Sequence, residues 1–111
     1  MKSFKNAAGI IVLTPKGRLT GGTETDEVKA AIEKILSDGD TKLVVDLGDT
    51  QYLNSSALGI FVSSHKKFID KGGKMKLARV GKSIDNILVI TKLSLVFDVF
   101  DSVEEAVSSF S

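Results

Sequence analysis

Residues 43–59 read LVVDLGDTQYLNSSALG, and this stretch decides the fold. Its first five residues, Leu43–Leu47, form a nearly continuous apolar run of strand length, typical of a parallel strand that is covered on both faces. We therefore expect this strand in the middle of a sheet. Apolar residues then recur with helical spacing over residues 58–69, and Gly72-Gly73 supplies a C-terminal stop. The N-cap of this helix is expected to be Asn54, Ser55 or Ser56.

The chain before this stretch opens with β-structure. Phe4 and the apolar run at 10–13 flank a turn-prone segment at 6–9, which predicts two strands joined as a hairpin. Pro15 has no amide donor, so the continuation through residues 16–19 is expected on a sheet edge or at a bulge.

The remaining elements alternate between helix and strand. The patterns predict a helix from Thr23 capped by Thr23 or Thr25, a strand at 74–80, a helix opening at Ser83, a strand at 96–100, and a terminal helix with a capping box at Ser102 and Glu105. The order β-β-α-β-α-β-α-β-α indicates one α/β domain over residues 1–111, with four helices and a mixed sheet. The opening hairpin is antiparallel and the later strands are parallel. Such folds place functional groups beyond the carboxyl ends of their strands, and the loop after Leu47 is one such place.

Composition narrows the classes of function. The chain has 15 basic and 14 acidic residues and a net charge of +1, so we expect neither nucleic acid nor an anionic membrane as its partner. There is no cysteine and one histidine, which argues against a metal site, and no motif calls for a cofactor. No apolar run has the length of a signal peptide or of a membrane span, so we expect a cytoplasmic protein that does not insert into a membrane.

Two hydroxyls stand at the start of the second helix, in Asn54-Ser55-Ser56. A serine there commonly caps the helix by accepting a backbone amide proton. The same place also suits phosphorylation, because free amides and the helix dipole stabilise a phosphate of about −1.5 to −2 charge. A partner docked over this segment would then lose contact while the fold stays intact.

The whole chain resembles a STAS domain of the anti-sigma factor antagonist family. The similarity lies in Gly17-Arg18-Leu19, Val44-Val45-Asp46-Leu47, Asn54-Ser55-Ser56-Ala57-Leu58-Gly59, Gly72-Gly73 and the segment at 100–106. In that family the central motif commonly begins with an aspartate followed by the phosphoacceptor serine, which makes Ser55 the matching residue here. Asn54 replaces the aspartate, and Ala57 replaces a common glycine.

The resemblance implies a switch protein without catalytic residues of its own. Its unphosphorylated form would sequester an anti-sigma factor that is a serine kinase, that kinase would phosphorylate Ser55, and a metal-dependent serine phosphatase would restore the protein. The partner-binding residues are expected to be Thr20, Asp49, Asn54, Ser55, Ser56 and Ala57. A STAS subunit that regulates a membrane transport system without being phosphorylated is the alternative, and Asn54 favours it.

Other polar groups are assigned structural roles. Asp46 and Asp49 could bind magnesium or accept a phosphoryl group as in a response-regulator receiver. A receiver would need an acidic pair where this chain has Thr20-Gly21-Gly22 after Leu19, so we expect both aspartates to order the loop, with Asp49 able to touch a partner. His65 falls on the apolar stripe of the second helix and is expected to be a packed histidine. The lysines at 66, 67, 71, 74 and 76 are expected to form a solvated face. No catalytic set emerges, so an enzyme is not expected.

Overall fold

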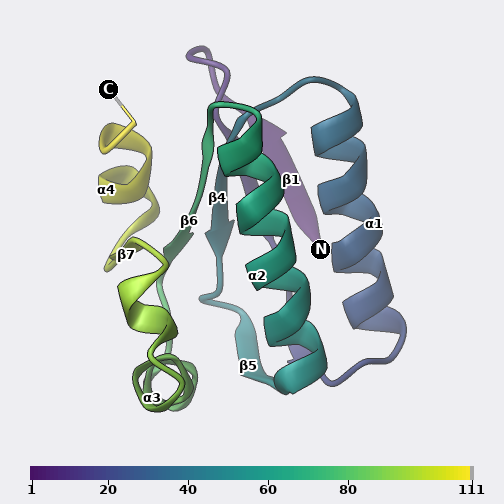
Figure 1. Cartoon of the computed structure of the whole chain (residues 1–111), viewed down its shortest axis with the longest axis vertical. Helices are drawn as coiled ribbons and strands as arrows, with labels where there is room; N and C mark the ends of the chain where they lie inside the picture. The colour runs from purple at the N-terminus through teal and green to yellow at the C-terminus, as the bar shows by residue number, and fades with distance from the viewer. Residues whose placement is uncertain (111) are drawn as a thin grey trace.

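A five-stranded sheet forms the centre of the computed structural model, which describes residues 1–110 (Figure 1). Its strands lie in the order β1 (Lys2–Lys5), β2 (Ile11–Thr14), β4 (Lys42–Asp46), β6 (Lys74–Ala78) and β7 (Val99–Phe100). The pair β1–β2 is antiparallel and all other neighbours in this sheet are parallel. The central position of β4 confirms the prediction from its apolar run, because the side chains of residues 43–45 are fully buried.

The helices cover the two faces of this sheet unequally. They are α1 (Thr23–Ser37), α2 (Ser55–Asp70), α3 (Lys82–Ile90) and α4 (Val103–Ser108), with a short 3-10 helix η1 (Leu93–Leu95). Side chains of β2 alternate: Ile11 and Leu13 enter the large core under α1 and α2, whereas Val12 packs with Ala106 of α4 on the opposite face. The period-two pattern of the strands therefore builds a large core on one side and a small one on the other.

Two further strands form a separate parallel sheet that the sequence did not predict. β3 (Gly17–Leu19) pairs with β5 (Thr50–Leu53). A sheet with two strands has only edges, and the register shifts between Gly17 and Arg18, so the edge or bulge expected at residues 16–19 is confirmed; the strand at 50–53 was not expected. Pro15 interrupts the chain between β2 and β3, and its carbonyl oxygen accepts a bond from the Thr50 hydroxyl at 3.2 Å. The short sheet exists because these two segments complete each other's hydrogen bonds.

The ends of several elements also differ from expectation. α1 begins after Gly22, and the Thr25 hydroxyl accepts a bond from the Gly21 amide at 2.9 Å, so neither threonine is the N-cap. α3 begins after Gly81, one residue earlier than predicted. The last strand is only two residues long because the chain before it turns through η1 and buries Phe97. The Ser102 cap is confirmed, with its hydroxyl accepting from the Glu105 amide at 3.1 Å.

Candidate functional site

The N-terminus of α2 is built directly on the end of β5. Asn54 links the two elements with extended backbone angles, and its Oδ1 accepts a hydrogen bond from the Ala57 amide at 3.1 Å. This is the N-cap geometry, in which a short polar side chain satisfies one of the free amides of the first helical turn. Of the three candidates, Asn54 is the cap.

Ser55 and Ser56 consequently have no structural task. Both side chains are exposed, and within residues 1–110 neither hydroxyl takes part in a side-chain hydrogen bond. The first turn of α2 carries no acidic residue. The positive end of the helix dipole is therefore not offset by its own side chains, and an added phosphate would be stabilised there.

A second loop lies against this helix start. The Asn54 amide donates to the carbonyl oxygen of Leu19, the last residue of β3, at 3.0 Å. A Cβ placed on Gly21 would lie 3.9 Å from the Cβ and Oγ of Ser56. Exposed Thr20 lies between these two contacts. We call Thr20, Asn54, Ser55 and Ser56 the helix-start surface; it lies where α2 begins, at the lower end in Figure 1.

Two of the six expected partner-binding residues do not contribute to the helix-start surface. Asp49 is exposed, but its carbonyl oxygen accepts from the Gly17 amide at the opposite end of β5, about 16 Å of extended chain from Asn54. It borders a separate open depression with Lys16 and Glu24. Ala57 is 2% exposed and packs in the core, so its side chain is not available to a partner.

The β3–β5 sheet brings together two side chains that the sequence did not single out. Arg18 and Tyr52 lie opposite each other in register, and the guanidinium carbon of Arg18 lies 4.8 Å from the centre of the Tyr52 ring. This distance is typical of a cation–π contact. The sequence did not predict a strand at 50–53. Without that strand there was no reason to place Arg18 and Tyr52 side by side.

Asp46 orders the loop that follows β4, in agreement with its expected role. Its carboxylate is buried, accepts a bond from the Gly48 amide at 3.0 Å and pairs with Arg79 at 3.2 Å. A Cβ on Gly48 would overlap the Arg79 guanidinium, so a larger residue there would displace the flexible end of this side chain from Asp46. Each Asp46 oxygen therefore has a partner within the molecule, one on the loop backbone and one on β6's flanking residue Arg79.

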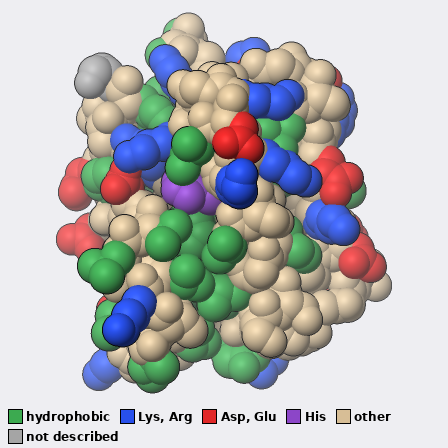
Figure 2. Space-filling model, viewed as in Figure 1, with side chains coloured by type: hydrophobic (Ala, Val, Ile, Leu, Met, Phe, Trp, Pro, Cys, Tyr) green, Lys and Arg blue, Asp and Glu red, His purple; other side chains and the backbone are tan. Residues whose placement is uncertain are grey.

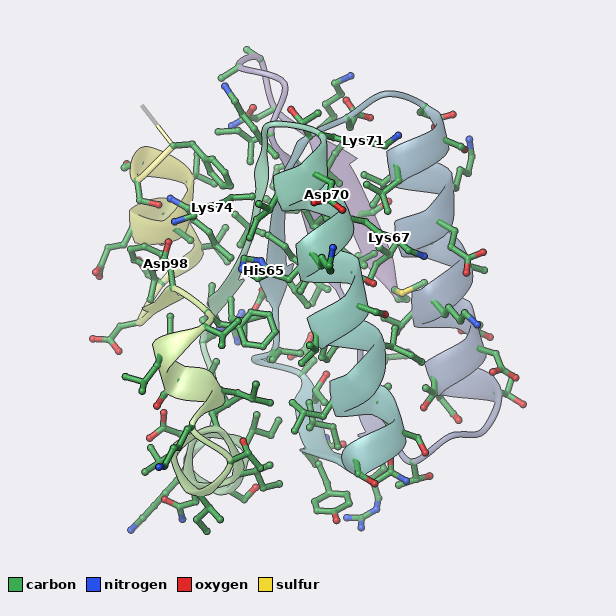
Figure 3. All side chains as sticks on the ribbon, in the orientation of Figure 1. His65, Lys67, Asp70, Lys71, Lys74 and Asp98 are labelled. Carbon is green, nitrogen blue, oxygen red and sulfur yellow. The ribbon has the colours of Figure 1, made fainter. Side chains whose placement is uncertain are left out.

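His65 is packed as predicted and lies toward the opposite end of α2 from the helix-start surface (Figure 3). Its ring lies 5.1 Å from that of Phe97, and its Nδ1 has no hydrogen-bond partner in the described part of the chain. Burial, followed by the charge of Lys74, lowers the pKa of His65, and Asp98 opposes this shift.

The basic cluster at the end of α2 is largely paired within the molecule. Basic and acidic side chains intermingle over this part of the surface in Figure 2. Lys66 pairs with Asp70 at 3.5 Å and Lys74 with Asp98 at 3.0 Å.

Lys76 departs from the expected solvated face. It is 6% exposed, and its amine donates to the Ser109 carbonyl and hydroxyl at 3.1 and 2.7 Å between the rings of Phe100 and Phe110. Burial lowers the pKa of Lys76. This lysine holds the C-terminal end of α4 on the sheet.

Residues 1–110 lack two features that would have pointed to other functions. No group of three or more acidic or histidine side chains is arranged to hold a metal ion. No helix in the described chain combines the length and the apolar character that crossing a bilayer requires.

The fold and the site together define a small α/β domain with two exposed serines at the start of a helix. Comparison with known families agrees: the STAS domain model matches residues 2–106. The chain belongs to the STAS domain family.

Relatives within the family are assigned as anti-sigma factor antagonists. A Thermotoga maritima protein with that assignment is 24% identical over 106 residues, covering 96% of this chain and 94% of its own. An anti-sigma F factor antagonist of Paenibacillus polymyxa is 23% identical and covers 85% of this chain and 80% of its own.

Solved structures share the fold. The Thermotoga maritima crystal structure gives a TM-score of 0.89 at 21% identity, covering 97% of this chain and 92% of that one. Phosphorylated SpoIIAA of Bacillus gives 0.79 at 14% identity, covering 99% and 98%. The STAS domain of a SulP transporter from Vibrio cholerae gives 0.72 at 14% identity, covering 88% and 77%. The fold alone is therefore common to antagonists and transporter domains.

Proposed function

We propose that this protein is an anti-sigma factor antagonist that acts in the cytoplasm as a phosphorylation-switched binding module and not as an enzyme. In its unphosphorylated form it sequesters an anti-sigma factor that is also a serine kinase. That kinase ends the interaction by phosphorylating Ser55, and a metal-dependent serine phosphatase reverses the modification. The proposal goes beyond the names of the relatives, which support an anti-sigma factor as the partner.

One observation carries the proposal: Asn54 caps α2 and thereby leaves the Ser55 hydroxyl exposed and without a hydrogen bond in the described chain. A hydroxyl committed to capping would have to break that bond before a kinase could use it. Here the acceptor oxygen is accessible, and the free amides of the first turn are ready for the product phosphate.

The switch acts through surface chemistry. A partner seated on the helix-start surface would contact small neutral groups at Thr20, Ser55 and Ser56. Phosphorylation places a charge of about −1.5 to −2 and three acceptor oxygens in that contact. Charge repulsion and the desolvation of the phosphate would then weaken binding of the partner. Because neither serine supports the core, the domain keeps its structure in both states.

One residue favours the transport alternative. Asn54 lacks the charge of the aspartate common in the antagonist motif, and the fold is shared with a transporter STAS domain. A subunit of that kind would bind its partner at the same surface without phosphorylation. The two candidates therefore differ in one measurable event, the addition of a phosphoryl group to Ser55.

Incubation with candidate serine kinases and ATP, followed by intact mass, tests this event. Wild type and Ser56→Ala should each gain one phosphoryl group, whereas Ser55→Ala should gain none. Modification that persists in Ser55→Ala would refute Ser55 as the acceptor. No gain with any kinase encoded beside the gene would favour the transport alternative.

Binding completes the test. Ser55→Glu should weaken affinity for the kinase partner in calorimetry, while the neutral control Ser55→Gln should weaken it less. Both should keep the circular-dichroism spectrum of the wild type, since Ser55 is exposed. Equal affinity for all three proteins would show that charge at this position does not control docking.

A further inference from the structure

Arg18 carries an unneutralised charge next to the helix-start surface. Its side chain is exposed, and among residues 1–110 no carboxylate forms an ion pair with it. Its guanidinium rests on the Tyr52 ring at 4.8 Å. At an exposed position such a contact is weak, so little holds the side chain there.

The backbone brings Arg18 close to Ser55. The Leu19 carbonyl oxygen and the Asn54 amide form a 3.0 Å hydrogen bond, and Arg18 and Ser55 each adjoin one end of it. The path runs from Arg18 to Leu19, across to Asn54, and on to Ser55. One Cα step at each end and one gap between strands keep the Cα atoms of Arg18 and Ser55 within about 13 Å. Side chains alternate along β3, so Arg18 and Thr20 lie on the face opposite buried Leu19. An extended arginine and a phosphoserine together cover this distance.

We propose that Arg18 is the residue that binds the phosphate on Ser55, leaving the Tyr52 ring to do so. This inference rests on the proposed function, in which Ser55 is the acceptor. A guanidinium is always charged and presents a planar fork that matches two phosphate oxygens. Such charge-assisted pairs are stronger than the exposed cation–π contact that Arg18 would give up.

Movement of Arg18 from the Tyr52 ring to the phosphate would change both the helix-start surface and the neighbouring surface of β5. Phosphate would occupy the start of α2, and Arg18 would swing away from Tyr52 on β5. Arginine and tyrosine are both enriched among the residues that dominate binding energy at interfaces. When Arg18 moves to the phosphate, the Tyr52 ring is uncovered. The partner would then lose the Arg18–Tyr52 pair as a docking contact at the same time as it meets the charge of the phosphate.

A test that needs no kinase uses full-length protein with phosphoserine incorporated at position 55 during synthesis. Phosphorus NMR titration reports the second pKa of the phosphate, ordinarily about 6. Pairing with Arg18 should lower this pKa by about half a unit relative to the Arg18→Gln variant. The difference should shrink at high salt. Lys16→Gln removes an equal charge from an exposed side chain two residues earlier in the chain and should change the pKa less.

Equal pKa values in wild type and Arg18→Gln would overturn the proposal, as would an equally large effect of Lys16→Gln. Tyr52 is the only tyrosine and there is no tryptophan, so intrinsic fluorescence gives a second readout. Its intensity should differ between phosphorylated and unphosphorylated wild type and not between the two forms of Arg18→Gln. A kinase that ignores Ser55 would count against the proposed function and leave this pairing measurable.

Discussion

Replacing Asn54 by alanine tests whether the cap and the switch are separate. The variant loses the Asn54 Oδ1 to Ala57 amide bond of 3.1 Å and leaves that amide without its partner beside a buried side chain. Loss of an N-cap costs about 1 kcal/mol, within a range of about 0.5–2. For a chain of 111 residues, 1 kcal/mol corresponds to a fall in Tm of about 4 °C.

The matched controls are Ser55→Ala and Ser56→Ala, which remove exposed hydroxyls from the same turn. Each should change the free energy of unfolding by no more than about 0.5 kcal/mol. Asn54→Asp should retain the cap and gain a few tenths of a kcal/mol from the helix dipole. Urea and thermal unfolding of the four variants, followed by circular dichroism, provide the measurement.

A reversed order of stabilities among these variants would refute Asn54 as the cap. A wild-type Tm for Asn54→Ala together with a loss in Ser55→Ala would make the serine hydroxyl the cap in solution. Phosphorylation would then have to compete with helix stability, and the accessible hydroxyl on which the proposed function depends would be absent.

Two glycines and one histidine give further predictions. Gly73→Ala should cost about 3 kcal/mol in urea unfolding, because its Cβ overlaps the Thr41 carbonyl oxygen. Gly59→Ala, in a helix with open space around it, should instead raise the free energy of unfolding by about 0.5–1 kcal/mol. A stabilised Gly73→Ala together with a destabilised Gly59→Ala would contradict the packing at these two sites. Burial holds the pKa of His65 below its ordinary value of about 6.5, so the unfolded chain binds more protons and stability falls as the pH drops below about 6.5. His65→Phe should flatten this decline in Tm between about pH 5 and 7, and an unchanged decline would assign it to other groups.

The sequence predicted the elements in which the order of apolar and polar residues reflects which side chains of that element are buried. The run at 43–47 is apolar because both faces of β4 are covered, and the helical spacing at 58–69 reflects the single buried stripe of α2. The sequence left three candidates for the N-cap of α2, Asn54, Ser55 and Ser56, since each side chain can accept a hydrogen bond from a backbone amide. Only the backbone geometry selected Asn54.

The parts that could not be predicted depend on partners distant in sequence. Thr50–Leu53 forms a strand because β3 lies beside it, and the pairing joins segments more than thirty residues apart. The last strand was expected at 96–100, but the packing of Phe97 against His65 draws its first half out of the sheet. Lys76 looked like part of a solvated face, and its burial depends on Ser109 of the distant C-terminal segment.

Capping by Asn54 also has an evolutionary meaning. Since the helix start holds together whatever side chain stands at position 55, one codon change there can add or delete an acceptor hydroxyl at almost no cost to folding. Under the proposed function, a lineage can therefore convert a regulated binding domain into a permanently active one, and back again, without passing through an unstable intermediate. Duplicated copies of such a gene could diverge in regulation while keeping a common scaffold.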